Sequence, residues 1–127
     1  MREDFIEDHE RLYRAVPDRP SHWKPKFNRP TTALFKDPHG ASVDRDGRRA
    51  ENELIEHLRT EKPGYGLVKL VAQDCRGIPT HPVPRPLPAN AYHAEIHDSE
   101  NQVEIRTKWK RRALVTCCEV VLAPDEF

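Results

Sequence analysis

Alternating histidine and glutamate residues give this sequence its clearest chemical signal. His93, Glu95 and His97 occupy every second position of the segment AYHAEIHD (91–98), and in a strand such residues project from one face. Two imidazoles and one carboxylate are a ligand set for zinc or iron(II), whereas without metal a His–Glu pair can act as an oriented general base. The solvent-exposed face of an ordinary strand carries the same residue types. All three interpretations therefore stay open, and no metal ligand or cofactor is assigned.

Charged residues also crowd the segment ASVDRDGRR (41–49), where a predicted strand ends and a turn leads into a helix. Its charged members are Asp44, Arg45, Asp46, Arg48 and Arg49. Arginines just before a helix N-terminus add to its positive end and attract phosphate or carboxylate groups. The segment is therefore either an anion-binding turn or a solvated turn held by local ion pairs.

The segment RTKWKRR (106–112) places five basic residues around Trp109. Such a helix can lie along a phosphate backbone while the tryptophan stacks on a base. However, Ile105, Trp109 and Ala113 have i, i+4, i+8 spacing, which predicts that the tryptophan lies on the buried stripe of the helix. The basic residues then form the solvent-exposed side, and a nucleic-acid partner is not favoured.

Alternating helices and strands must position these residues. Helical spacing and capping residues predict helices over 3–15, over 49–62 and from Ser99 onward. Apolar alternation and β-branched residues predict strands over 31–36, 41–45, 67–73, 91–98 and 115–122, the first two forming a hairpin. Proline clusters over 16–30 and 79–88 exclude helices and central strands there.

This order of elements predicts an α+β fold with one domain over residues 1–127. We expect a mixed sheet of about five strands, about three helices and two proline-rich extended connectors. The residues expected to be mostly buried are Leu54, Leu58, Val68, Leu70, Ile96, Trp109 and Val121.

Composition excludes several classes of protein. The 21 basic residues balance the 21 acidic ones among 127 residues, so no global charge attracts nucleic acid or anionic lipid. No apolar run approaches the ~20 residues of a membrane span, and the acidic start MREDFIEDHE lacks the apolar stretch of a signal peptide. Three cysteines without a CxxC pair predict reduced thiols and a cytoplasmic location.

The phrases SVDR (42–45) and PLPANAYHAEI (86–96) resemble a pattern of small uncharacterised bacterial proteins. The resemblance implies no activity, but it points to Ser42, Asp44, Asn90, His93 and Glu95. With the patterns above, it gives His93, Glu95 and Asp44 as candidate catalytic residues. The candidate ligand-binding residues are Arg45, Asn90 and His97.

The favoured function is that of a small accessory or binding protein, acting through a protein partner or a small ligand. One alternative is a hydrolase-like enzyme, with or without a metal, that uses His93 and Glu95. The other is a nucleic-acid-binding protein that uses the basic helix over 106–112. No membrane partner is expected.

Overall fold

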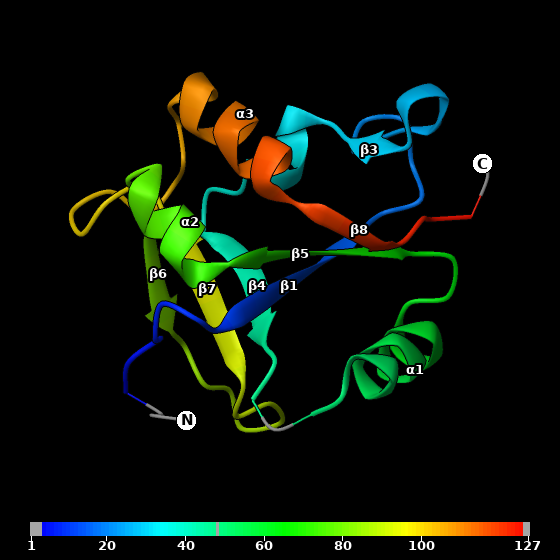
Figure 1. Cartoon of the computed structure of the whole chain (residues 1–127), viewed down its shortest axis with the longest axis horizontal. Coiled ribbons are helices and arrows are strands. Elements are labelled where there is room, and N and C mark those ends of the chain that lie inside the picture. Colours follow the sequence, from blue (N-terminus) through cyan, green and yellow to red (C-terminus); the bar gives the residue numbers. More distant parts are fainter. Residues whose placement is uncertain (1–3, 48, 126–127) are drawn as a thin grey trace.

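A six-stranded antiparallel sheet organises the computed structural model of the chain, which describes residues 4–47 and 49–125. The strand order is β6-β7-β4-β1-β5-β8 (Figure 1), and every neighbouring pair is antiparallel. The strands are β1 (Arg11–Val16), β4 (Ala41–Arg45), β5 (Gly66–Val71), β6 (His81–Pro84), β7 (His93–His97) and β8 (Glu119–Leu122). The predicted α+β fold is confirmed, with more strands than the roughly five expected. The mixed sheet that was expected is instead antiparallel.

A small hairpin lies outside this sheet. Its strands β2 (Trp23–Lys24) and β3 (Arg29–Pro30) are joined by the 3-10 turn η1 (Pro25–Phe27). The hairpin occupies the first proline cluster, in which Pro25 begins the turn and Pro30 is buried. The second proline cluster contains β6, which lies at the edge of the main sheet, where proline is tolerated.

Helices cover both faces of the sheet. They are α1 (Glu51–Glu61), α2 (Ala72–Gly77), α3 (Lys108–Cys117) and the 3-10 helix η2 (Thr32–Phe35). In Figure 1, α3 and η2 lie on one side of the sheet and α1 lies on the other. We call these two sides the α3 face and the α1 face.

Strand alternation divides the apolar residues between two cores. Leu12 and Val16 of β1 belong to the larger core, on the α3 face. Tyr13, between them in the sequence, belongs to the smaller core with Leu54 and Leu58 of α1. β1 is therefore buried on both faces, as expected for a strand with neighbours on each side.

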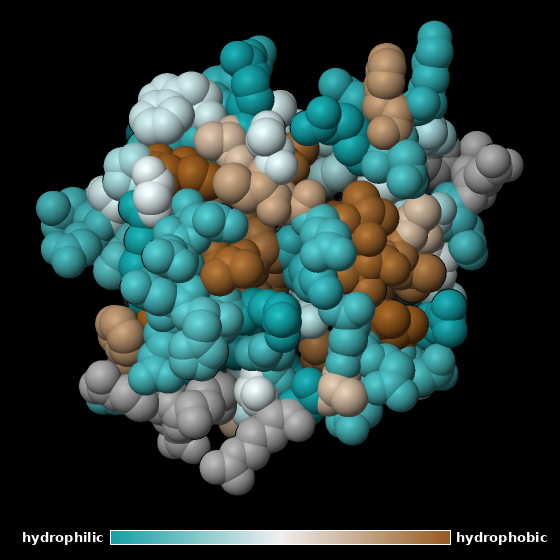
Figure 2. All heavy atoms as spheres, viewed as in Figure 1, coloured by the Kyte–Doolittle hydropathy of each residue, from teal (hydrophilic) through white to brown (hydrophobic). Residues whose placement is uncertain are grey.

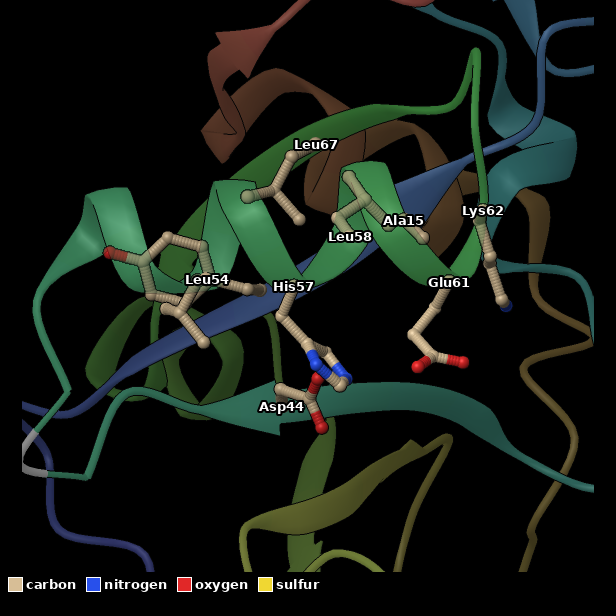
Figure 3. A pocket seen from close by; sticks show the side chains of 9 residues that line it. Ala15, Asp44, Leu54, His57, Leu58, Glu61, Lys62 and Leu67 are labelled. Atoms are coloured by element: carbon tan, nitrogen blue, oxygen red, sulfur yellow. The ribbon is translucent and has the colours of Figure 1, made fainter.

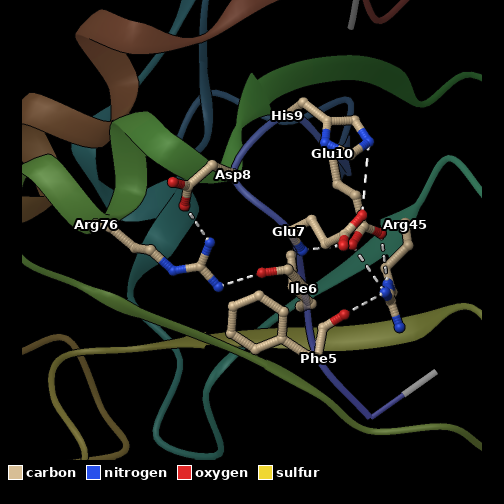
Figure 4. A network of polar contacts seen from close by, with 8 residues as sticks. All are labelled: Phe5, Ile6, Glu7, Asp8, His9, Glu10, Arg45 and Arg76. Atoms are coloured by element: carbon tan, nitrogen blue, oxygen red, sulfur yellow. Dashed lines mark hydrogen bonds and ion pairs between the residues drawn. The ribbon is translucent and has the colours of Figure 1, made fainter. Parts of the chain in front are cut away.

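The helix predicted over 3–15 is wrong, because Arg11–Val16 forms the strand β1. A strand buried on both faces does not alternate strictly, so its apolar residues matched a helical spacing. The residues before it form an irregular segment held by two arginines (Figure 4). Arg76 donates hydrogen bonds to the Asp8 carboxylate, at 2.6 Å, and to the Ile6 carbonyl oxygen.

Two further expectations fail for local reasons. The segment predicted as a strand over 31–36 forms η2, which buries the adjacent residues Leu34 and Phe35 together, so the predicted hairpin over 31–45 is absent. The helix predicted from Ser99 begins only at Lys108, because Ser99 pairs with Gln102 in a turn.

The late start of α3 changes the environment of Trp109. Ile105 is buried but precedes the helix, so the i, i+4 spacing does not describe one helical face. Trp109 is 55% exposed, and its predicted burial is wrong. The other expected core residues are buried, except for Val121, which is partly buried against the smaller core.

The helix predicted over 49–62 and the strand over 91–98 are confirmed as α1 and β7. The strand predicted over 67–73 is confirmed as β5 only as far as Val71, because Ala72 begins the short helix α2. The strand over 115–122 is confirmed only in its second half, because its first residues belong to α3. Within residues 4–47 and 49–125, no helix has both the length and the apolar composition needed to cross a bilayer.

Candidate functional site

A row of polar side chains crosses the α1 face of the sheet. The strand register aligns Lys69 of β5 with Tyr13 of β1, Tyr13 with Asp44 of β4, and Asp44 with His93 of β7. Since residues paired across antiparallel strands project from the same face, these four side chains form one continuous line. We call it the polar row.

Two adjoining cavities lie over Tyr13, Asp44 and His93 of the polar row, and together we call them the sheet-face groove. They have volumes of about 130 and 300 Å³ and share Tyr13, Ala15, Asp44 and Lys62. The first also contacts Leu54, His57, Leu58, Glu61 and Leu67 (Figure 3). The second also contacts Ser42, Val43, Asn90 and His93. The groove therefore combines an apolar floor beneath α1 with a polar end over β4 and β7.

Asp44 is held at the centre of the groove by Asn90. The Asn90 Nδ2 atom donates a hydrogen bond of 2.6 Å to Asp44 Oδ1, while Asn90 Oδ1 accepts one of 3.0 Å from the Tyr92 backbone N–H. Both ends of the amide are thus engaged, which fixes its orientation. Asp44 keeps further acceptor capacity for a ligand, because a carboxylate offers about four lone-pair sites.

His93 presents one ring nitrogen to the groove region. Its Nδ1 atom donates a hydrogen bond of 2.8 Å to the carbonyl oxygen of Arg85. Since a carbonyl cannot donate, Nδ1 carries the proton, and in the neutral ring Nε2 is an acceptor. A neutral imidazole oriented in this way can take a proton from a ligand or accept its hydrogen bond.

Tyr13 is fixed by contacts to α1 and β5. Its hydroxyl donates a hydrogen bond of 2.8 Å to Glu51 Oε2, and Lys69 Nζ donates one of 2.7 Å to the same oxygen. Burial, followed by the hydrogen bond to Glu51, raises the pKa of Tyr13 above its ordinary range. Tyr13 therefore stays a neutral phenol at the base of the groove.

Helix α1 and the residue that follows it supply titratable groups that the sequence patterns did not reveal. His57, Glu61 and Lys62 line the first cavity, and in Figure 3 His57 and Asp44 extend into it from opposite walls. His57 follows the buried residue Leu54 by three positions, so it lies beside the apolar stripe of the helix. That position at the border of a buried face is the sequence signal that could have identified it.

An aromatic contact joins the two loops at the polar end of the groove. The Arg49 guanidinium lies 4.3 Å from the centroid of the Tyr92 ring. Gly47, at φ +58°, lies so close that an added Cβ would be 2.4 Å from this ring. The loop into α1 and the loop into β7 are thus locked together.

Glu95 and His97 pair with each other next to the groove. His97 Nε2 donates a hydrogen bond of 2.7 Å to Glu95 Oε1, and Arg85 Nε lies 3.9 Å from the same oxygen. Gly40, at φ +93°, packs over both side chains. Neither residue lines the two cavities, so the structure separates them from Asp44 and His93.

Arg45 lies away from the groove, on the opposite face. It is 1% exposed and donates hydrogen bonds of 2.8 Å to each carboxylate oxygen of Glu10 (Figure 4). Burial raises the pKa of Glu10, but the bonds from Arg45 and the Glu7 amide outweigh it and hold the pKa below its ordinary value. This ion pair accounts for Arg45 as a structural residue. Arg48 of the predicted anion-binding turn lies outside the described residues.

The described residues include few groups suited to hold a metal ion or to act as a nucleophile. In residues 4–47 and 49–125, no group of three or more His, Cys, Asp or Glu side chains is placed to hold a metal ion. His93, Glu95 and His97 therefore do not form such a group. Cys75 is buried, and burial raises the pKa of its thiol well above the ordinary value, which makes it a weak nucleophile.

Comparisons with protein-family models, with characterised proteins and with solved structures find no match.

Proposed function

We propose that the protein binds a small polar ligand in the sheet-face groove. The observation that carries the proposal is the convergence of Asp44, His57, Asn90 and His93, from two strands, one loop and one helix, on adjoining cavities. Ligand sites are concave, with mostly apolar walls and a few converging polar groups. The groove has this composition.

The chemistry of the groove limits the ligand. Leu54, Leu58 and Leu67 suit an apolar part, such as a ring, in the first cavity. Asp44 accepts hydrogen bonds, so the polar part of the ligand needs donors such as hydroxyl or amino groups. We therefore propose a compact ligand with one apolar side and several donors. The three free cysteines support a cytoplasmic location as part of this proposal.

Amide chemical shifts of isotope-labelled protein test the proposal. The probes are panels of nucleosides, amino acids, sugars and amines, and the expected shifts cluster at Asp44, His57 and His93. Asp44→Asn keeps the shape of the side chain but removes its charge, and we expect it to weaken binding. Glu95→Gln is the matched control, because Glu95 faces His97 rather than the cavities. Shifts that cluster elsewhere, or equal effects of both variants, would contradict the proposal.

One observation favours an enzyme as the second candidate. Ser42 lines the second cavity together with Asp44 and His93, and a hydroxyl, a carboxylate and an imidazole are the components of hydrolytic catalysis. If the groove is hydrolytic, wild-type protein turns over p-nitrophenyl esters and His93→Gln abolishes the turnover. Equal turnover by both proteins excludes this candidate.

A further inference from the structure

Two acid-free stretches of the sequence form neighbouring parts of the structure. No aspartate or glutamate lies between Asp18 and Asp37 or between Glu104 and Glu119. The first stretch forms the β2–β3 hairpin and η2, and the second forms α3. α3 packs against η2 through the larger core. The fold therefore concentrates positive charge on one surface of a chain whose net charge is zero.

A cleft of about 560 Å³ lies between the hairpin and α3. Lys24, Arg29 and Arg112 line it, and we call it the basic groove. Figure 2 shows hydrophilic side chains projecting along the edge of the molecule that carries these elements. Within the part of the chain that the structure describes, none of these three cations forms an ion pair.

Neighbouring cations outside the groove behave differently. Lys110 Nζ lies 2.7 Å from Asp98 Oδ1, and Arg106 Nε lies 2.8 Å from Glu104 Oε1. The acidic groups near α3 thus neutralise residues beside the groove and leave its lining positive. A lining of this kind attracts a ligand with several negative charges.

The basic groove also presents an exposed aromatic ring. Phe27 lines it and is 64% exposed, at the end of η1, where Asn28 adopts a left-handed conformation with φ 50°. Trp23 is 4% exposed and anchors the hairpin in the larger core. The hairpin therefore exposes the apolar ring of Phe27 to solvent, and this exposure loses the free energy that burial of the ring would provide.

A second exposed aromatic residue extends the same surface. Trp109 and Arg112 of α3 are three positions apart in the sequence (i, i+3) and therefore lie on the same side of the helix. Arg112 and Thr116 line the groove, so Trp109 lies about one turn beyond the groove on this side. The surface thus has an aromatic residue within the groove and another beyond it.

We propose that the basic groove binds single-stranded nucleic acid. Lys24, Arg29 and Arg112 contact successive phosphates, and unpaired bases stack on Phe27 and, farther along, on Trp109. Positively charged grooves with exposed aromatic rings are the usual construction of sites that bind single strands without sequence preference. A duplex fits this surface poorly, because its bases are stacked on each other and offer no free face to Phe27.

Fluorescence anisotropy with labelled oligothymidine and oligouridine of about 15 nucleotides tests the charge contribution. We expect binding at low salt that weakens steeply between about 50 and 200 mM salt. Arg29→Ala combined with Arg112→Ala should weaken binding at least tenfold and reduce the slope of log K against log salt by about 1.4. Arg59→Ala is the matched control, because Arg59 is an exposed arginine on α1.

The stacking contribution needs a separate pair of variants. Phe27→Ala should weaken binding roughly five- to hundredfold without changing the salt slope, because it removes a stacked base and no charge. Phe27→Leu keeps an apolar side chain without a ring and should lose nearly as much. Leu87→Ala, at another exposed apolar residue, should bind like wild type. Circular dichroism melts show that each variant is folded.

Three results would overturn the proposal. They are no binding at about 50 mM salt, equal affinity for a duplex or for heparin, and wild-type affinity of Phe27→Ala. A difference between oligothymidine and oligouridine identifies which single strand is preferred. His93→Gln should leave this binding unchanged, so the result is independent of the sheet-face groove.

Discussion

The two faces of the central sheet show how neighbouring residues of one strand can serve different purposes. Arg45 projects to the α3 face, where it is buried in an ion pair with Glu10. Asp44 projects to the α1 face, where it lines both cavities of the sheet-face groove. The α3 face is closed by α2, α3 and η2, whereas α1 covers only part of the other face. Arg45 therefore stabilises the fold from one face, whereas Asp44 is free to serve the ligand binding proposed for the sheet-face groove on the other.

The largest expected effect concerns the ion pair on the α3 face. Arg45→Ala leaves the buried Glu10 carboxylate without its partner, and such a loss costs about 3–5 kcal/mol of unfolding free energy. Urea denaturation at neutral pH measures it. Replacing both partners, by Arg45→Met with Glu10→Leu, should recover most of the loss. If Arg45→Ala alone were as stable as wild type, the Arg45–Glu10 pair would not be what holds the N-terminal segment.

The two cores provide the next comparison. Leu114→Ala, in the larger core, and Leu58→Ala, in the smaller one, should each cost about 2–5 kcal/mol. We expect Leu58 at the lower end, because it is 8% exposed whereas Leu114 is fully buried, and a cavity near solvent collapses or fills more readily. Denaturation of both variants under the same conditions measures the difference. A larger loss for Leu58→Ala would reverse the ranking of the two faces.

The sequence predicted the elements whose pattern reflects a single buried face. Leu54 and Leu58 mark the one apolar stripe of α1, and Ala94 and Ile96 alternate with polar residues along β7. It failed for β1, because Leu12 and Tyr13 are consecutive and both buried, on opposite faces. A short strand of that kind cannot be distinguished from a helix by periodicity.

The candidate site was predicted only in part for a related reason. Asp44 and His93 were recognised because charge and alternation are visible within one segment. The same groove also includes Tyr13, His57 and Lys62. The strand register and the position of α1 bring them there, and no local sequence pattern encodes either the register or that position. Arg45 and Asp44 are adjacent in sequence, so only the three-dimensional structure could separate their roles.

Acid stability distinguishes the carboxylates of the two faces. Burial raises the pKa of Glu10, but its hydrogen bonds with Arg45 and Glu7 have the larger combined effect and lower it. The hydrogen bond from Lys69, followed by that from Tyr13, lowers the pKa of Glu51. A lowered carboxyl pKa contributes stability that is present above the ordinary pKa of about 4.3 and is lost as pH falls through the folded value.

Unfolding free energy measured from about pH 5 to 2 at low and high salt tests this distinction. Glu10→Gln should reduce the pH dependence equally at both salt concentrations, since the pair is buried. Glu51→Gln should reduce it mainly at low salt, because the Glu51 side chain is 38% exposed and salt screens exposed pairs. An equal response to salt would mean that the two carboxylates have similar environments.

The smallest expected effect on stability is that of His93→Gln, on the open part of the α1 face. The His93 side chain donates a hydrogen bond to the carbonyl oxygen of Arg85. A glutamine at this position can still donate to that oxygen, although the imidazole is lost. Since surface substitutions of this kind usually change unfolding free energy by less than about 0.5 kcal/mol, we expect a variant as stable as wild type.

If the α1 face serves ligand binding, the same variant should lose the chemical-shift response of the groove to any ligand found there. A loss above about 2 kcal/mol would instead make His93 part of the folded framework. The contrast between a stabilising face and a binding face would then disappear at β7 and remain only at β4, between Asp44 and Arg45.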